Sequence, residues 1–419
     1  GDSLGRTIAN DLGDSMLAKI EKIRKLAKSG RNDAEAGPLV TQLEALPDED
    51  LLPVARAFTQ FFNLANIAEE HHRVRRQKQS LGGVRKDDLQ HLITKLRAKS
   101  FSKEKIHATL CEMTIDLVLT AHPTEVNRRT LINKHDHIMG CLKDLDHGID
   151  SSGRLDELIS QIWHTKEIRK QRPTPVDEAR WGFTAVETSL WEAVPRFLRE
   201  LDSRMTEGLG EGLPLICSPI KFSSWMGGDR DGNPNVTAKV TEEVLLLARW
   251  MAADLYYKDV DELRAELSMH KANAELRSRV GEAEAESEPY RAILGGLRQR
   301  LKKTRDGLTQ QLKSSALVSH EDWIETGADL LEPLLLCHRS LVDEGMQIIA
   351  NGKLQDLIRR IACFGITLIQ LDIRQNAEVH ADVLKELCDF YNLGDYLAWS
   401  EEKKQTFLLE QLATKRPLI

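Results

Sequence analysis

Three short polar stretches carry the side chains best suited to chemistry. They are residues 120–125 (TAHPTE), 227–234 (GGDRDGNP) and 372–375 (DIRQ), and each one follows a short apolar segment. Together they bring an imidazole, several carboxylates and two arginines. Such groups transfer protons and bind phosphate or carboxylate ligands.

The first stretch places His122 just before Pro123, a residue that suits the first turn of a helix. An imidazole titrates near neutral pH, so His122 can hold or pass a proton at this position. Arg129 follows about two turns later and is a candidate ligand for an anion. A histidine at the end of a strand can equally be structural, and the residue alone leaves both interpretations open.

The second stretch combines three glycines with Asp229, Arg230 and Asn233. Glycine permits close backbone approach and positive φ, so this loop can hold polar groups in a fixed arrangement. The spacing GxxxxGK[ST] is absent, so the loop is not a P-loop. A tight turn with an internal Asp–Arg pair is the alternative interpretation.

The third stretch carries Arg374, which leaves the end of an apolar segment. A guanidinium group at a strand end is well placed to bind phosphate or carboxylate with two parallel hydrogen bonds. Pairing of Arg374 with an internal acid is the alternative.

The apolar segments before these stretches are predicted strands. They span about 116–120, 219–225 and 366–373, and long helical stretches separate them. Two strands joined by a long helical connection are typically parallel. The polar residues that follow such strands gather at the carboxyl ends of the sheet. In a TIM-type barrel that end is the active face, but three strands cannot close a barrel of about eight. The sequence thus predicts a mainly α fold with a few parallel β-strands, an incomplete (β/α) barrel with long helical insertions.

The chain divides into two predicted regions. Residues 1–112 are predicted to form helices only. Apolar residues recur at helical spacing in 14–28, and a helix is expected to begin at the acidic residue Asp48. Residues 113–419 hold the predicted strands and their helical insertions. The helices expected in this second region are 124–145, 154–170, 177–207, 241–271, 288–313, 320–343 and 352–362.

Composition excludes several function classes. The 419 residues carry 58 lysines and arginines against 65 aspartates and glutamates, a formal charge of −7, which argues against a nucleic-acid binder held by bulk charge. The best candidate for a membrane helix, 244–253, is interrupted by Arg249 and is far shorter than the roughly 18 apolar residues that such a helix needs. The six cysteines show no CxxC spacing, and no signal pattern begins the chain, so we expect reduced thiols in the cytoplasm.

No metal ligands are predicted within these residues. The histidines at 71–72 and 135–137 lack the HExxH spacing that puts two ligands on one helical face. No cluster of carboxylates is typical of a Mg²⁺ site.

Taken together and in order, these motifs resemble phosphoenolpyruvate carboxylase of the bacterial type. The combination of TAHPTE and GGDRDGNP is the most specific part of a resemblance that spans essentially the whole chain. The matching stretches are 51–58, 119–125, 163–169, 222–234 and 372–375. The chain departs from the family at Asn376-Ala377, where bacterial relatives often have Glu-Ser.

The resemblance implies a lyase that forms oxaloacetate from phosphoenolpyruvate and bicarbonate, through carboxyphosphate and an enolate. His122 matches the active-site histidine, and Arg374 matches an arginine that holds the substrate's phosphate or carboxylate. Trp225 matches a tryptophan that lines the pocket where CO₂ is trapped. Asp229, Arg230 and Asn233, with Arg129, are the further candidate substrate-binding residues.

The resemblance also implies that the family's Mg²⁺- or Mn²⁺-binding acids, its second catalytic basic residue and its effector site lie further along the chain. We therefore expect an N-terminal half that is inactive alone. For the whole enzyme we expect a homotetramer that responds to acetyl-CoA and to aspartate or malate. The alternative is a complete helical binding or assembly module with a carboxylase-like surface and no catalysis. The reading frame beyond Ile419 discriminates between the two.

Overall fold

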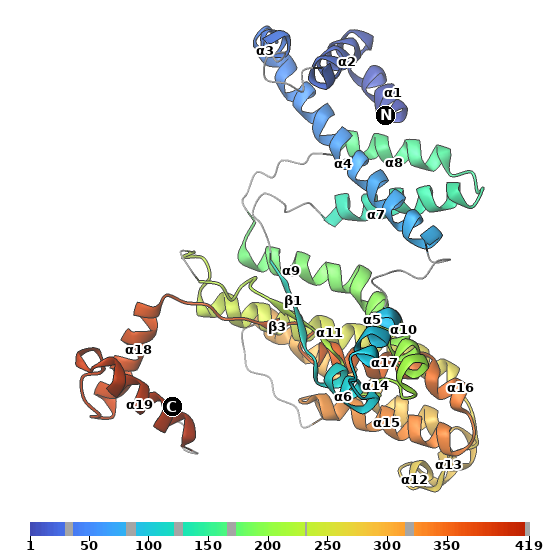
Figure 1. The fold of residues 1–419 in the computed structure, drawn as a ribbon, viewed down its shortest axis with the longest axis vertical. Coiled ribbons are helices and arrows are strands. Elements are labelled where there is room, and N and C mark those ends of the chain that lie inside the picture. The colour runs from blue at the N-terminus through green and yellow to red at the C-terminus, as the bar shows by residue number, and fades with distance from the viewer. Residues whose placement is uncertain are drawn as a thin grey trace. The chain divides into compact units, whose positions relative to one another are not determined.

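A computed structural model describes residues 1–29, 37–80, 89–120, 129–165, 173–230, 233–314 and 322–414. Its helices and strands are drawn in Figure 1. The chain forms two compact units. Unit 1 comprises residues 1–91 with 127–172, and unit 2 comprises 92–126 with 173–419. The boundary predicted from the sequence lies at residue 112, just before the first predicted strand. That boundary is based on the type of secondary structure and not on packing, and it stays a prediction.

Unit 1 is helical throughout its described residues. The helices predicted from 14–28 and from Asp48 onward are confirmed as α2 and α4. Apolar side chains from five of the helices form one core, which includes Ile8, Ile20, Val54, Leu131 and Trp163. The helices of this unit are α1 (Asp2–Leu12), α2 (Asp14–Ser29), α3 (Gly37–Glu44), α4 (Asp48–Ser80), α7 (Arg129–Asp146) and α8 (Ser152–His164).

The end of α8 is the best-anchored point of unit 1. The buried Trp163 indole donates to Asp11 Oδ2 at 2.7 Å, and the Arg56 guanidinium lies 5.1 Å from the ring centroid. Arg56 also donates to the Thr165 carbonyl at 2.8 Å, and Lys134 Nζ donates to the Thr165 hydroxyl at 2.7 Å. Two cations thus satisfy polar groups at the carboxyl end of a helix, where positive charge is favourable.

Unit 2 is built around a small parallel sheet in the order β1–β2–β3. β1 (Ile115–Leu119) pairs in register with β2 (Ile220–Ser224), and β3 (Gln370–Leu371) pairs with the end of β2. All three predicted strands are confirmed in place and direction. The third prediction, 366–373, was too long, because residues 365–369 form a turn in which Leu368 takes a positive φ of 63°. Leu368 and Ile369 are buried by that turn and not by strand pairing.

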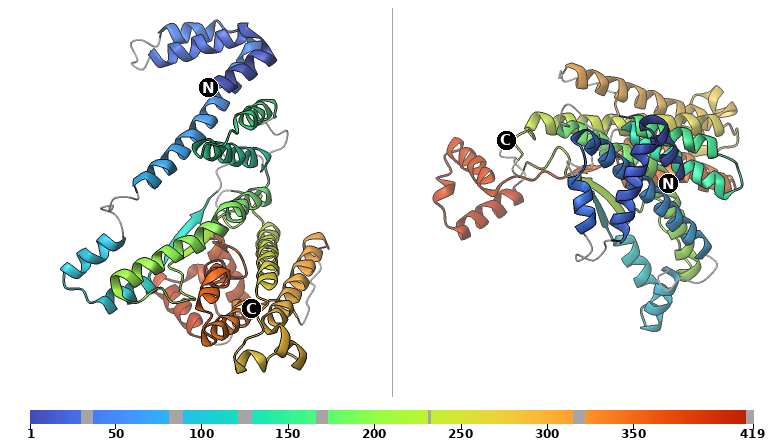
Figure 2. Two further views of the ribbon diagram at one scale, coloured as in Figure 1. Left: turned by 90° about the vertical axis from the view of Figure 1, so that its right-hand side faces the viewer. Right: turned by 90° about the horizontal axis from the view of Figure 1, so that it is seen from above.

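Long helices form the rest of unit 2. They confirm, with different ends, the insertions predicted at 177–207, 241–271, 288–313, 320–343 and 352–362. The insertions predicted at 124–145 and 154–170 correspond to α7 and α8 of unit 1, and residues 124–128, 166–170 and 320–321 of these predictions lie outside the described residues. α11 and α14 lie side by side (Figure 2). No helix of the described ranges is long and apolar enough to cross a membrane. The main helices are α6 (Lys103–Glu112), α9 (Pro175–Ala185), α10 (Trp191–Leu209), α11 (Ala238–Glu266), α14 (Pro289–Ser314), α15 (Gly327–Asp343), α17 (Gln355–Phe364), α18 (Ala377–Phe390) and α19 (Glu401–Ala413). Helix α5 (Leu89–Ala98) straddles the boundary between the units. The remaining short elements are η2 (Val186–Leu190), α12 (Ala274–Arg277), α13 (Glu282–Ser287), α16 (Gln347–Ile349), η3 (Ala350–Leu354) and η4 (Tyr396–Ala398).

A row of aromatic rings joins the sheet to these helices. Phe222 of β2 stacks on Phe364 of α17 at 5.4 Å between centroids, and Phe364 stacks on Trp191 of α10 at 5.3 Å. Tyr256 of α11 lies 5.1 Å from Trp191, and its hydroxyl donates to the Gly365 carbonyl at 2.8 Å. Stacked and tilted aromatic pairs stabilise a core beyond the area that they bury. The row therefore fixes the middle strand against three helices.

A buried arginine closes the same core. Arg360 donates to the Trp191 carbonyl at 2.8 Å, to Asp259 Oδ2 at 2.9 Å and to Glu192 Oε1 at 2.6 Å. The Trp191 indole donates to Asp259 as well, at 3.0 Å. Burial raises the pKa of Asp259, and the Arg360 cation opposes that rise. The ion pair thus links α17 to α10 and α11 with its hydrogen bonds satisfied.

The six cysteines all lie within described ranges and are free thiols. Burial raises the pKa of Cys337 to about 12. A thiol with so high a pKa is a poor nucleophile at neutral pH, which matches a role as a small apolar core residue.

The aromatic row yields a stability prediction. Phe364→Ala removes the ring that touches both the sheet and α10, and we expect it to lower the free energy of unfolding by about 3–5 kcal/mol. The matched control is Phe390→Ala, since Phe390 is 76% exposed and its loss is expected to change stability by less than about 0.5 kcal/mol. Urea unfolding followed by circular dichroism measures both, and equal midpoints for the two variants would contradict the described core.

Candidate functional site

The carboxyl ends of the three strands meet at one edge of the sheet, as the parallel pairing requires. Trp225 follows β2, and Asp372 and Arg374 follow β3. The residue after β1 is Thr120, the last residue described before 129. His122 therefore lies outside the described residues. Arg129 begins α7 in unit 1, and its side chain is likewise outside the description.

Main-chain pairing continues past the ends of β2 and β3. The Arg374 amide donates to the Gly228 carbonyl at 3.0 Å, and the Arg230 amide donates to the Arg374 carbonyl at 2.9 Å. These two hydrogen bonds form an isolated parallel bridge between Asp229 and Arg374. The loop after β2 is therefore held alongside the segment after β3, and two of the motifs predicted from sequence are brought together.

Two adjacent glycines allow this close approach. Gly227 has φ +84°, and a Cβ there would lie 2.6 Å from Val244 Cγ2. A Cβ on Gly228 would lie 2.2 Å from the Asp372 carbonyl oxygen, a distance that real Cβ atoms do not show. Positive φ at the first position and backbone contact at the second confirm why the loop needs glycine at both.

Trp225 and Arg374 form the centre of the site. The Arg374 guanidinium carbon lies 4.5 Å from the indole centroid, a cation–π arrangement. Arg374 Nη1 is 3.7 Å from Asp229 Oδ2, which is an ion pair but too long for a hydrogen bond. The Trp225 indole nitrogen donates to Asp372 Oδ2 at 3.2 Å. Trp225 is 36% exposed and the Arg374 side chain 45%, so a small solute can reach both.

Arg230 is the second cation of the site. Its Nη2 donates to the hydroxyl of Thr241 at 3.3 Å, and that hydroxyl donates to the Gly227 carbonyl at 2.8 Å. Arg230 Nε is buried and has no hydrogen-bond partner within the described part of the chain. A buried donor without a partner costs free energy. The alternative expected for Arg374, pairing with an internal acid, is confirmed by its ion pair with Asp229.

The remaining loop residue, Asn233, has a local role in the described structure. Its amide donates to the Arg230 carbonyl at 3.2 Å, and its side-chain oxygen accepts from the Asn235 amide at 3.0 Å. The side chain is exposed and stabilises the turn. Asn376, where the sequence departs from the resemblance, caps α18 by accepting from the Glu378 amide at 3.0 Å.

Sequence reasoning missed two residues of the site. Asp372 lies in the 372–375 motif but was given no role from the sequence. Its position two residues before Arg374 could have indicated that the two side chains lie on the same side, since alternate residues of an extended segment share a face. Thr241 gave no signal, because only the fold brings this first-turn residue of α11 to the loop after β2.

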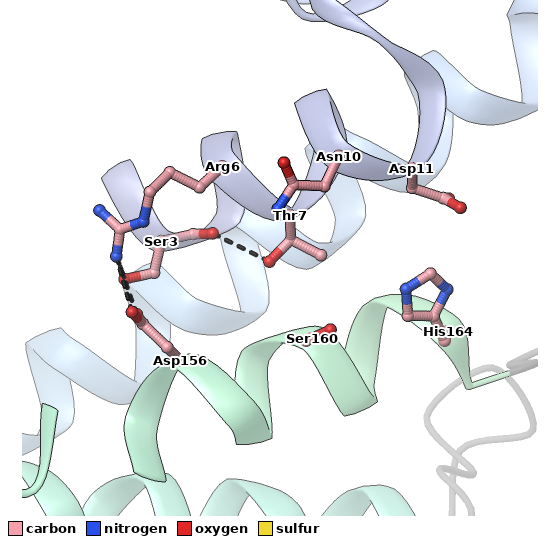
Figure 3. A pocket seen from close by; sticks show the side chains of 8 residues that line it. All are labelled: Ser3, Arg6, Thr7, Asn10, Asp11, Asp156, Ser160 and His164. Atoms are coloured by element: carbon pink, nitrogen blue, oxygen red, sulfur yellow. Dashed lines mark hydrogen bonds and ion pairs between the residues drawn. The ribbon is translucent and has the colours of Figure 1, made fainter. Parts of the chain in front are cut away.

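Unit 1 contains a polar hollow of its own (Figure 3). It has a volume of about 360 Å³ and lies between α1 and α8. Its cation, Arg6, already makes two hydrogen bonds to Asp156, at 3.0 and 2.8 Å. The positive charge in this hollow is therefore neutralised within the protein.

Comparisons with known proteins match the whole chain. The family model "Phosphoenolpyruvate carboxylase" matches residues 1–419. Proteins of that name from Chromohalobacter salexigens, Tolumonas auensis and Hahella chejuensis are 53%, 51% and 50% identical, and each alignment covers 100% of this chain and 48% of the relative. The chain thus spans about half the length of the curated relatives it matches.

The close approach at Gly228 yields a prediction. Gly228→Ala places a methyl group on the Asp372 carbonyl, and we expect the forced shift of the loop to cost about 1–3 kcal/mol of stability. Gly296→Ala is the control, since Gly296 lies in α14 with open space around it and alanine there is expected to gain up to about 1 kcal/mol. Denaturant unfolding measures both. A Gly228→Ala protein as stable as the wild type would disprove the contact.

Proposed function

Since the chain belongs to the phosphoenolpyruvate carboxylase family, we propose that the full-length protein carrying this sequence converts phosphoenolpyruvate and bicarbonate into oxaloacetate and phosphate. It acts as a carbon–carbon lyase of the cytoplasm. The observation that carries the proposal is the grouping of Arg374, Trp225 and Arg230 at the carboxyl edge of a parallel sheet. In parallel-sheet enzymes this edge is where ligands bind.

Arg374 and Arg230 are the proposed anion ligands. Phosphoenolpyruvate carries a phosphate and a carboxylate, and a guanidinium group can donate two parallel hydrogen bonds to either. As the phosphate leaves, negative charge moves onto the enolate oxygen. Fixed cations beside that oxygen stabilise the charge without reorganisation. The substrate anion replaces Asp229 as the partner of Arg374, because the 3.7 Å pair leaves the donors of Arg374 incompletely used.

Trp225 is proposed to line the place where CO₂ meets the enolate. An enolate is protonated readily by water, which would end the reaction at pyruvate. The indole offers an apolar surface beside the cations, and such a wall excludes water from the reacting carbon.

His122 and Arg129 stay proposals from sequence. His122 is proposed to position carboxyphosphate, or to hold a proton beside it, because an imidazole changes charge near neutral pH. Asp229, Asn233 and Arg129 complete the proposed substrate-binding set. Asp229 acts as the exchangeable partner of Arg374, and Asn233 acts through the shape of its loop.

The family's divalent metal, Mg²⁺ or Mn²⁺, does not fit the described residues. No group of three histidine, cysteine, aspartate or glutamate side chains within the described ranges is placed to hold an ion. We therefore derive no step through a metal, and we propose that its ligands come from the other half of the full-length protein.

We propose further that the three strands belong to a larger parallel barrel. β1 is at the edge of the described sheet, and its apolar residues Ile115, Leu117 and Val118 are 46%, 45% and 40% exposed. Apolar residues on both faces are typical of a strand covered on both sides. By family membership we propose a homotetramer with acetyl-CoA and aspartate or malate as effectors.

The first prediction compares two lengths of the protein. In a coupled oxaloacetate assay with Mg²⁺ and bicarbonate, we expect turnover by the full-length protein and none by residues 1–419, because the metal ligands are missing. Metal-dependent turnover by residues 1–419 would refute the need for the other half. A folded full-length protein that forms no oxaloacetate would refute the function and favour the binding-module alternative.

The second prediction concerns Arg374. In the full-length protein Arg374→Lys keeps the charge but removes the planar fork, and we expect kcat/KM for phosphoenolpyruvate to fall by about 10²-fold or more. Arg279→Lys is the control, because Arg279 is exposed and distant in sequence from all three motifs. Steady-state kinetics at saturating bicarbonate measures both. Equal kcat/KM values for the two variants would remove Arg374 from substrate binding.

A further inference from the structure

We propose that Asp372 is a positioning residue of this site, which holds the Trp225 indole in place so that the ring covers the reacting carbon. This inference rests on the function proposed above. It assigns a role to a carboxylate that is neither a predicted substrate ligand nor part of any metal-binding group in the described structure.

The Asp372 carboxylate is a fixed acceptor. The Asp372 amide donates to the Ser224 carbonyl at 2.9 Å, and its own carbonyl packs against Gly228. The main chain is thus held on both sides, by the end of β2 and by the loop that follows it. From this anchored position Oδ2 accepts the Trp225 indole N–H at 3.2 Å.

The indole needs such an anchor. Trp225 is 36% exposed, so core packing alone does not restrain its side chain. Its amide donates to the Leu119 carbonyl at 3.3 Å, which fixes the backbone but leaves χ1 and χ2 free. Asp372 at the ring edge and Arg374 on the ring face together define the plane of the indole. Residues 372 and 374 present these two groups on one face because they are two positions apart in an extended segment.

Loss of the anchor has a chemical consequence. In the normal reaction the enolate carbon forms a bond to CO₂ and yields oxaloacetate and phosphate. When the indole swings away, water donates a proton to the same carbon, and phosphoenolpyruvate and water yield pyruvate and phosphate. Asp372 thus controls the partition of the enolate more than the binding of substrate.

The test uses a matched pair of variants in the full-length protein. Asp372→Ala removes the acceptor, whereas Asp372→Asn removes the same charge and keeps an oxygen for the indole N–H. We expect Asp372→Ala to raise the ratio of pyruvate to oxaloacetate at least about threefold with little change in the KM of phosphoenolpyruvate. We expect Asp372→Asn to restore most of the wild-type ratio. An unchanged ratio in Asp372→Ala would overturn the role, because neither the charge nor the hydrogen bond would then affect the partition. An equal rise in both variants would also overturn it, because the charge and not the hydrogen bond would then matter.

A double-mutant cycle and a spectroscopic readout complete the design. Trp225→Phe keeps a ring under Arg374 but lacks the N–H, so Asp372→Ala should have no further effect on the ratio in that background. In ¹⁵N-tryptophan-labelled residues 1–419, Trp225→Phe identifies one indole N–H signal. Asp372→Ala should shift that signal and speed its exchange with water, while Asp372→Asn should not. An unmoved signal would overturn the anchor itself. This readout is independent of activity, so it also judges the anchor if the full-length protein makes no oxaloacetate.

Discussion

The pairing of main chains beyond the ends of β2 and β3 is the constraint on which the site depends. Two hydrogen bonds, between Arg374 and the peptide groups of Gly228 and Arg230, join segments about 145 residues apart in the chain. Backbone groups have fixed geometry, so this pairing determines where the side chains of both segments emerge. The row of aromatic rings from Phe222 to Tyr256 packs the middle strand, β2, against the helices. The loop that follows β2 therefore starts from a strand that is fixed in the core.

The positive charge of Arg374 is partly compensated within the described residues. Arg374 faces Asp229, and the Trp225 indole faces Asp372. A cluster of unpaired arginines would cost free energy in the absence of substrate, because like charges repel and partial burial weakens their hydration. The pair at 3.7 Å places a negative charge beside Arg374 without a direct hydrogen bond between the two groups.

Much of this arrangement was accessible from the sequence. Apolar segments of strand length followed by polar residues predicted three parallel strands and placed the motifs of Trp225, Asp229 and Arg374 at one edge. The third strand was predicted too long because apolar character alone does not distinguish a strand from a buried turn, and Leu368 at positive φ ends the extended backbone. The contact of Thr241 depends on the packing of α11 against the loop after β2, which no spacing rule specifies. The described residues hold three strands, which are too few to close a barrel of about eight.

The exposed apolar face of β1 also has a consequence for protein synthesis. β1 leaves the ribosome about 100 residues before β2 and about 250 residues before β3. At about 5–20 residues per second, Ile115 and Leu117 wait several seconds for their first partner strand and up to about a minute for the whole described sheet. During that interval a nascent chain presents an unpaired edge with apolar side chains, the kind of surface that chaperones bind. The order of strands along the gene thus leaves this strand edge unpaired during part of synthesis.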